Sequence, residues 1–180
     1  MSILAATAIS LAMLQNVSTD FAQREATRLD ACIARIDEDA DEAYEDALAW
    51  SFEGNRPGAR QCVALALIAL GQEAEGAARL EELANASDGG SMDQRAVYLM
   101  QAGNAWLVAG APEAAVVTLT NALKIHPDDP DLLVDRASAR ILLEKWPEAI
   151  QDLDKALSAS PGLAAAHQLR AEAKLNMNDL

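Results

Sequence analysis

The sequence's densest group of reactive side chains is a run of seven carboxylates within ten positions. Such a run suggests calcium binding or a general acid and base pair. A calcium loop, however, needs a glycine turn and alternating ligands, which this run lacks. Acids at a helix start are favoured by the helix dipole. We therefore interpret the run as a solvated helix start and face, formed by Asp37, Glu38, Asp39, Asp41, Glu42, Glu45 and Asp46.

The other reactive residue types form no catalytic or metal-binding pattern. His126 and His167 lie too far apart in the register of the chain to share a metal ion. Cys32 and Cys62 do not form a C-x-x-C pair, so zinc and thioredoxin-like redox chemistry are unsupported. The sequence also lacks a G-x-S-x-G elbow and a glycine-rich phosphate loop. We therefore expect no enzymatic activity, no cofactor and no metal.

Composition favours helices and restricts the partners. The 180 residues are enough to bury a core without staples, and 63 of them are Ala or Leu, against 20 Val, Ile and Thr. That mixture prefers helix to strand and excludes an all-β fold. The formal charge of −14 argues against nucleic acid and anionic lipid as partners.

A repeat of 34 residues organises the second half of the chain. Its anchors are Pro127 and Pro161, and the units start at Ala96 and Pro130. Small or apolar residues then recur at positions 8, 20, 24, 27 and 28: Gly103 and Ala137, Ala115 and Ala149, Leu119 and Leu153, Ala122 and Ala156, Leu123 and Leu157. With proline at position 32, this pattern resembles the tetratricopeptide repeat (TPR) family. The resemblance implies an all-α, right-handed superhelix of antiparallel helix pairs.

The repeat also has a physical explanation. Two helices approach closely only where side chains are small, so Ala or Gly at positions 8, 20 and 27 brings the backbones together. Proline then ends the second helix, because it removes a backbone donor and biases the preceding residue away from helical angles. Pro112 and Pro147, each followed by glutamate, mark the starts of second helices.

Weaker copies extend the array in both directions. A unit starting at Pro57 fits if Ser91 to Arg95 are an insertion, although position 27 is the larger Leu83. A degenerate unit before it keeps Ala31 and Ala43 at positions 8 and 20 and has Trp50 at 27. We divide 24–180 into units of about 24–56, 57–95, 96–129 and 130–163 and a terminal helix, 164–178, with Ala171 at position 8. This helix is a lone cap or, as we favour, precedes a truncated or processed end.

Residues 1–23 differ from the repeats. Ile3 to Leu14 is a nearly unbroken apolar run of 12 residues, too short for a membrane span of about 20 but long enough for a secretory signal. No basic residue precedes it, and no clean cleavage site follows it. We expect export, for example to the periplasm. The alternative is a helix that docks on the first repeat of a cytoplasmic protein.

The cysteines bear on the same question. In the repeat register Cys32 falls at position 9 of one first helix and Cys62 at position 6 of the next, and these positions face each other in stacked units. We therefore expect a disulfide, which fits an oxidising compartment. Two buried free thiols are the alternative.

Family resemblance places ligand contacts on the first helices, near positions 2, 5, 6, 9, 12 and 13. The best-known TPR mode grips a peptide carboxylate with Lys and Asn. Asn104 matches one element, but Met100 stands where Lys is needed and Asp135 where Asn is needed, so an anionic terminus would be repelled. The expected contacts are Gln61, Met100, Gln101, Asn104, Asp135, Ser138 and Gln168.

The groove therefore predicts a non-enzymatic interaction module. Its partner is an apolar to mildly basic segment of a protein or peptide, extended or helical. The alternative is a structural scaffold or homodimer, in which the chain's own N-terminal helix or a second copy fills the groove.

Overall fold

The computed structural model describes the backbone of residues 3–54 and 56–177 and the side chains of residues 20–54 and 56–177. This part of the chain is helical and contains no strand. Its helices are α1 (Ile3–Glu38), α2 (Ala40–Phe52), α3 (Pro57–Ala69), α4 (Glu73–Asn85), α5 (Met92–Val108), α6 (Pro112–Ile125), α7 (Pro130–Leu142), α8 (Trp146–Ala159) and α9 (Ala164–Asn176).

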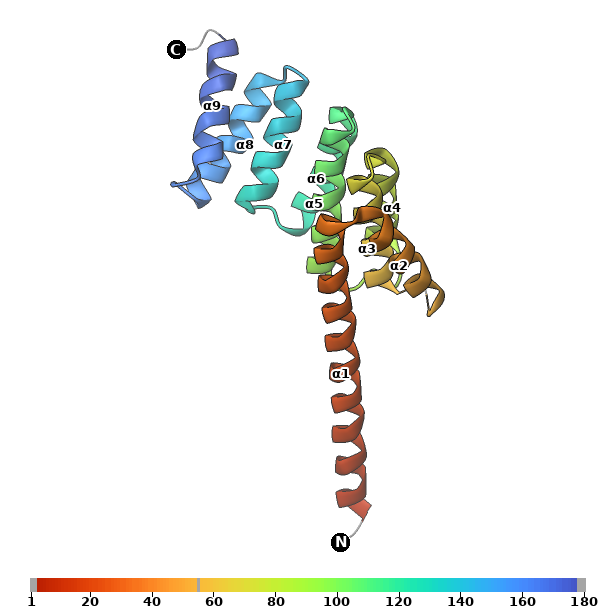
Figure 1. The fold of residues 1–180 in the computed structure, drawn as a ribbon. Helices are drawn as coiled ribbons and strands as arrows, with labels where there is room; N and C mark the ends of the chain where they lie inside the picture. Colours follow the sequence, from red (N-terminus) through yellow and green to blue (C-terminus); the bar gives the residue numbers. More distant parts are fainter. Residues whose placement is uncertain (1–2, 55, 178–180) are drawn as a thin grey trace.

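The helices form a stacked array in which each helix packs against its neighbours in the sequence (Figure 1). Odd-numbered helices are the first members of helix pairs, and α2, α4, α6 and α8 are the second members. First helices also contact each other, as α1 does with α3, α5 with α7, and α7 with α9. The array confirms the predicted all-α solenoid.

Short polar side chains and prolines set the helix boundaries. Asp39 accepts a hydrogen bond from the backbone N–H of Glu42 and caps α2, which identifies part of the acid run as a helix start. Asp129 caps α7 in the same way. Prolines occupy the first turns of α3, α6, α7 and α8, where a missing N–H costs nothing.

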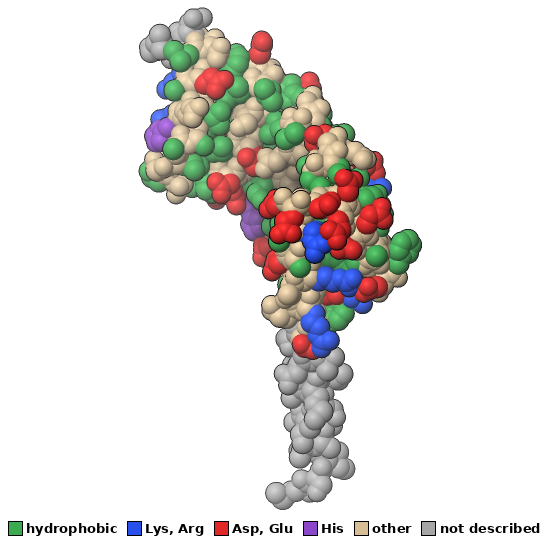
Figure 2. Space-filling model, in the orientation of Figure 1, with side chains coloured by type: hydrophobic (Ala, Val, Ile, Leu, Met, Phe, Trp, Pro, Cys, Tyr) green, Lys and Arg blue, Asp and Glu red, His purple; other side chains and the backbone are tan. Residues whose placement is uncertain are grey.

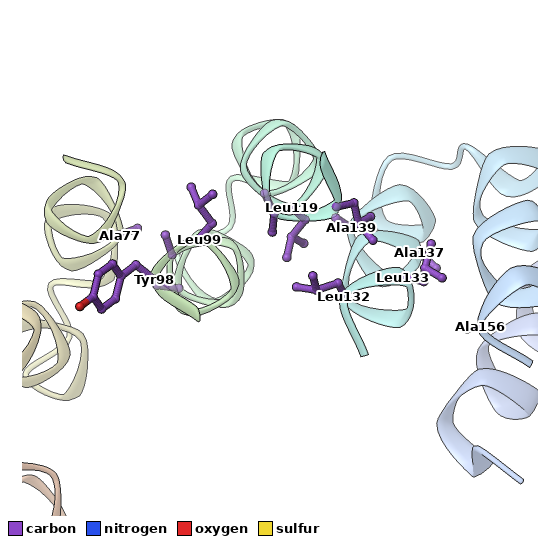
Figure 3. Close-up of a cluster of buried hydrophobic side chains, with 14 of the residues drawn as sticks. Ala77, Tyr98, Leu99, Leu119, Leu132, Leu133, Ala137, Ala139 and Ala156 are labelled. Atoms are coloured by element: carbon purple, nitrogen blue, oxygen red, sulfur yellow. The ribbon is translucent and has the colours of Figure 1, made fainter. Parts of the chain in front are cut away.

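The small residues of the repeat lie between helices, as predicted. Ala115, Ala122 and Ala137 are fully buried, and so are Ala149 and Ala156. A Cβ atom on Gly103 would lie 2.5 Å from Cγ of Leu119, so no larger residue fits without moving that side chain. Figure 3 shows Leu119 with other members of this core, which continues from α3 to α9. The helix separation therefore depends on these positions.

The turns inside the pairs share one conformation. Gly71 and Gly110, both at position 15, have φ angles of 78° and 72°. Glu144 takes the same position in the next unit with a φ of 55°. Glycine takes a left-handed backbone conformation easily because it lacks a Cβ atom. The third of these turns keeps the same conformation although its residue is glutamate.

The predicted insertion, Ser91 to Arg95, lengthens a helix. Ser91 caps α5 in a reciprocal capping box with Gln94, and the helix begins at Met92 rather than at Ala96. The side chain of Arg95 also donates to the backbone carbonyl of Ala84 at 2.6 Å. The extra residues thus add a turn to α5 and tie it to the end of α4.

The first unit departs most from the repeat. Trp50 at position 27 is 2% exposed and packs in a separate core between α1, α2 and α3, while Ala31 at position 8 is exposed. The bulky indole fills a position that is leucine in the next unit and alanine in the two that follow. The helix α1 continues without a break across the proposed boundary between residues 23 and 24.

Two predictions concern the ends of the chain. Docking by the apolar run at residues 3–14 would involve side chains outside the described residues. In α9, Ala171 is exposed, unlike Ala64, Gly103 and Ala137 at position 8, because the described residues contain no second helix to cover it. None of the described helices is long and apolar enough to cross a bilayer.

A disulfide links Cys32 of α1 to Cys62 of α3, with Cα atoms 6.2 Å apart. These are the two residues that the register brings face to face. Arg28 of α1 also binds Glu53, the residue that follows α2, with two hydrogen bonds of 2.7 and 2.9 Å. The end of α1 is therefore attached to the array covalently as well as by packing.

Replacing Gly103 with valine should destabilise the fold by about 2 kcal/mol, because overpacking a filled core typically costs about 1–3 kcal/mol. Urea unfolding followed by circular dichroism measures the loss. The matched control is Gly162→Val, where an added Cβ meets no atom within 4 Å and should change stability by under about 0.5 kcal/mol. Equal effects of the two variants would contradict the proposed close approach.

The denatured, unreduced protein should show no reactive thiol in a titration, since both cysteines are bonded. Reduction should lower the free energy of unfolding by roughly 3–4 kcal/mol in the chain-entropy model, given the sequence separation of 30 residues. A count of two thiols would rule the disulfide out.

Candidate partner-binding groove

Two hydrogen bonds join the first helices along one face of the array. The amide of Gln61 on α3 donates to Oε1 of Gln101 on α5 at 3.0 Å. One turn further along α5, Asn104 donates to Oδ2 of Asp135 on α7, also at 3.0 Å. We call Gln61, Gln101, Asn104 and Asp135 the polar row. Four of the predicted contact residues thus form two hydrogen-bonded pairs, which link α3 to α5 and α5 to α7.

The members of the polar row differ in how much of each side chain is exposed to solvent. Gln61 is only 6% exposed, so its amide mainly positions Gln101. Gln101, Asn104 and Asp135 are half-buried and keep one side open to solvent.

The other predicted contacts are more scattered. Met100 is half-buried and packs against the core rather than standing free in the groove. Ser138 is half-buried, and its hydroxyl donates to the carbonyl of Val134 within α7 at 3.0 Å. Gln168 lies exposed on α9. The structure therefore gathers the predicted contacts on first helices but places the polar row at their centre.

Asp135 is the electrostatic centre of the groove. Burial raises the pKa of its carboxyl, the hydrogen bond from Asn104 lowers it, and the negative charges of Asp131 and Asp129 raise it further. Burial is the largest of these effects. From α3 to α9, the positions expected to contact a ligand contain no Lys or Arg. The carboxylate at Asp135 therefore has an amide partner but no cation at these positions.

A cavity of about 480 Å³ opens beside the polar row. It lies between α1, α3 and α5, and Gln61 of the row lines it. Phe21 is 47% exposed and Val97 is 42% exposed, so both contribute accessible apolar surface to the lining of this cavity. Beside them, Glu25 accepts a hydrogen bond of 2.6 Å from Arg56, and that guanidinium stacks 4.8 Å from the Phe21 ring.

Val97 lies at position 2 of its unit, where the family resemblance places ligand contacts, but the α1 side of this cavity was not predicted. Its wall repeats every four residues, at Phe21, Glu25 and Leu29, which is the spacing of one helix face. The predicted boundary between residues 23 and 24 hides this spacing, because it separates Phe21 from Glu25 and Leu29.

A buried ion cluster outside the groove also escaped prediction. Asp152 of α8 is 4% exposed, and Arg136 of α7 binds its two oxygens at 2.9 and 2.7 Å. Arg140 binds the same carboxylate, while Arg136 also donates to Thr120 of α6. Both oxygens of Asp152 are occupied by protein groups, so the cluster ties three helices together rather than presenting a reactive carboxylate.

The remaining residues with reactive side chains lie apart from one another. His126 approaches Asp93 at 3.1 Å, and His167 lies 2.9 Å from the carbonyl of Pro161, so the two rings serve separate local contacts. Among the described residues, no group of three or more His, Cys, Asp or Glu side chains is arranged to hold a metal ion. Figure 2 shows acidic side chains gathered over the junction of α1 and α2, where the acid run lies on the surface.

Comparison with known proteins identifies the repeat. Residues 107–173 match the family model described as tetratricopeptide repeat. This stretch has the sequence pattern of tetratricopeptide repeats. The chain shares its fold with MamA from Desulfovibrio magneticus RS-1 at a TM-score of 0.70 and 18% identity, over 88% of this chain and 86% of that one.

Other solved TPR structures share the fold at similarly low identity. TTC0263 from Thermus thermophilus matches at a TM-score of 0.61 and 19% identity, over 86% of this chain and 84% of that one. The second TPR domain of human RPAP3, solved in complex with an HSP70 peptide, matches at 0.56 and 22%, over 64% of this chain and 92% of that one. The array of this chain thus has the TPR fold.

Replacing Asp135 with asparagine should raise the melting temperature at neutral pH, because the amide still accepts from Asn104 without a desolvated charge. The folded-state pKa of Asp135 is raised, so its contribution to stability is largest at low pH and is lost as pH rises through that pKa. The advantage of the variant should therefore shrink on acidification. Thermal unfolding between about pH 4 and pH 8 measures it.

The control is Glu113→Gln, which removes one exposed charge outside the groove. Its pH profile should follow that of the wild type. If the Asp135→Asn protein were less stable than the wild type at neutral pH, the ionised carboxylate would stabilise the fold, and the prediction would be wrong.

Proposed function

We propose that this protein is a non-enzymatic interaction module whose groove binds an apolar to mildly basic segment of a partner protein. The observation that carries the proposal is the Asn104–Asp135 pair, which bridges α5 and α7 at 3.0 Å and remains open to solvent on one side. The groove offers hydrogen-bonding amides, apolar side chains and an uncompensated carboxylate. A peptide backbone and a cationic side chain match these groups.

The solved relatives support peptide binding in general but differ in the chemistry required. The RPAP3 domain was solved with the HSP70 peptide SGPTIEEVD, whose final residues are acidic. Such a terminus would approach Asp135 with like charge, and Met100 offers no cation at the adjacent position. The groove of this chain therefore favours the opposite charge in its partner.

We also propose that the protein works in an oxidising compartment reached by export. The apolar run from Ile3 to Leu14 and the disulfide between Cys32 and Cys62 support this location independently. The intact mass of the protein purified from its native host distinguishes cleavage of the run from its retention.

The double variant Asn104→Ala, Asp135→Ala should weaken partner capture severalfold and leave the melting temperature nearly unchanged. Removing both members of a bonded pair orphans neither of them, so the cost to folding is small. Immobilised full-length protein, incubated with extract of the native host and quantified by mass spectrometry, measures capture.

The matched control, Glu113→Ala with Val117→Ala, alters one acid and one exposed apolar residue on α6, outside the groove. It should capture as the wild type does. Unimpaired capture by the Asn104 and Asp135 variant would remove the groove assignment. Sedimentation of the same samples tests the scaffold alternative, in which the groove is filled by a second copy.

A further inference from the structure

The groove contains two chemically different binding regions joined by the polar row. At one end lies the apolar cavity between α1, α3 and α5, and at the other lies Asp135. Gln61 belongs to both the cavity wall and the row, and its bond to Gln101 places α5 next in line. Val97, Gln101 and Asn104 are spaced as one face of α5, so the two regions lie on the same side of that helix.

The cavity is suited to a large apolar side chain. Its volume of about 480 Å³ lies within the usual range of ligand sites. Phe21, Leu29, Val97 and Tyr98 supply apolar surface, and Phe21 and Val97 are substantially exposed. The charged residues of the wall, Glu25 and Arg56, pair with each other through one oxygen of Glu25, so their charges largely offset each other.

The other region is suited to a cation. Asp135 is half-buried beside Asn104, with Asp131 and Asp129 close enough to repel its charge. The nearby guanidinium groups of α7, Arg136 and Arg140, are committed to Asp152 on the opposite side of the helix pair. A Lys or Arg side chain from a partner would supply the missing positive charge.

The helix spacing sets the distance between the two regions. Neighbouring packed helices lie roughly 8–10 Å apart, and the path from the cavity to Asp135 crosses one to two such spacings. An extended chain advances about 3.3 Å per residue, so this path corresponds to roughly three to six residues.

We propose that the partner is a separate polypeptide whose segment inserts an aromatic or long aliphatic side chain into the cavity of α1, α3 and α5 and places a Lys or Arg, about three to six residues away, against Asp135. This inference deepens the proposed function and rests on it. It adds α1 to the binding surface, together with the spacing of the recognised residues.

A library of random peptides of about 12 residues displayed on phage, selected on the full-length protein, tests the motif. Enriched peptides should share an apolar residue and a Lys or Arg at about the stated spacing. Failure to enrich any peptide would count against peptide binding itself and so against the proposed function. Enrichment of acidic or purely apolar peptides would overturn only the two-region motif.

A fluorescein-labelled consensus peptide then tests the placement by fluorescence anisotropy. Val97→Gln, which changes polarity but not charge, should weaken binding about tenfold, and Val117→Gln on α6 should not. Asp135→Asn should weaken binding about fivefold, and Glu113→Gln should not. A peptide that lacks the apolar residue should bind the wild type and Val97→Gln with equal affinity. A peptide that lacks the Lys or Arg should bind the wild type and Asp135→Asn with equal affinity.

Two results would reject the inference while leaving peptide binding intact. One is an enriched peptide whose affinity is the same for wild type and Val97→Gln. The other is self-association in sedimentation velocity that Val97→Gln abolishes, because the cavity would then hold a second copy of the chain.

Discussion

The close approach of helices at small residues is the constraint on which the array depends. Gly103 leaves no room for a Cβ atom against Leu119, and Ala115 and Ala122 are fully buried on the adjoining helix. Because side chains there cannot separate the backbones, the pairs that carry small residues at these positions take a similar compact form. Such pairs can then stack, which places α5 beside α7 and allows Gln61 of α3 to bond Gln101 of α5. The groove is a consequence of this geometry.

Equivalent positions in successive repeats form buried polar contacts between helices, but with different chemistry. Position 23 holds Thr118 in one unit and Asp152 in the next, and both are buried. The hydroxyl of Thr118 and the indole N–H of Trp106 both donate to Glu81 of the preceding unit. Asp152 instead receives guanidinium groups from its own unit. The repeat therefore keeps a buried polar tie between helices while its partners vary.

The sequence predicted those features that a single repeat determines. Small residues and prolines recurring at 34 positions specified the helix pairs, and the same register brought Cys32 beside Cys62. The capping box at Ser91 was harder to anticipate, because an insertion shifts the register without showing whether it forms a loop or a helical turn.

Features that depend on two units could not be read from either one. The bonds from Gln61 to Gln101 and from Asn104 to Asp135 arise only when neighbouring first helices are stacked. Alanine at position 8 likewise differs between units, since Ala137 is buried while Ala31 and Ala171 are exposed. Position within the repeat thus predicts which face a residue occupies, while its partners depend on the adjacent unit.

Two aspartates show how this chain distributes charge between stability and binding. Asp152 is nearly buried and receives two guanidinium groups, which is what a desolvated carboxylate requires for a stable fold. Asp135, half-buried on the neighbouring helix, receives only the amide of Asn104, and its closest charges are acids that raise its pKa. Arg136 and Arg140 belong to the same helix as Asp135 yet bind Asp152. In the proposed complex, a cation from the partner offsets part of the free energy that desolvation of the Asp135 carboxylate costs the folded protein. Segments that carry a Lys or Arg are therefore bound in preference to others.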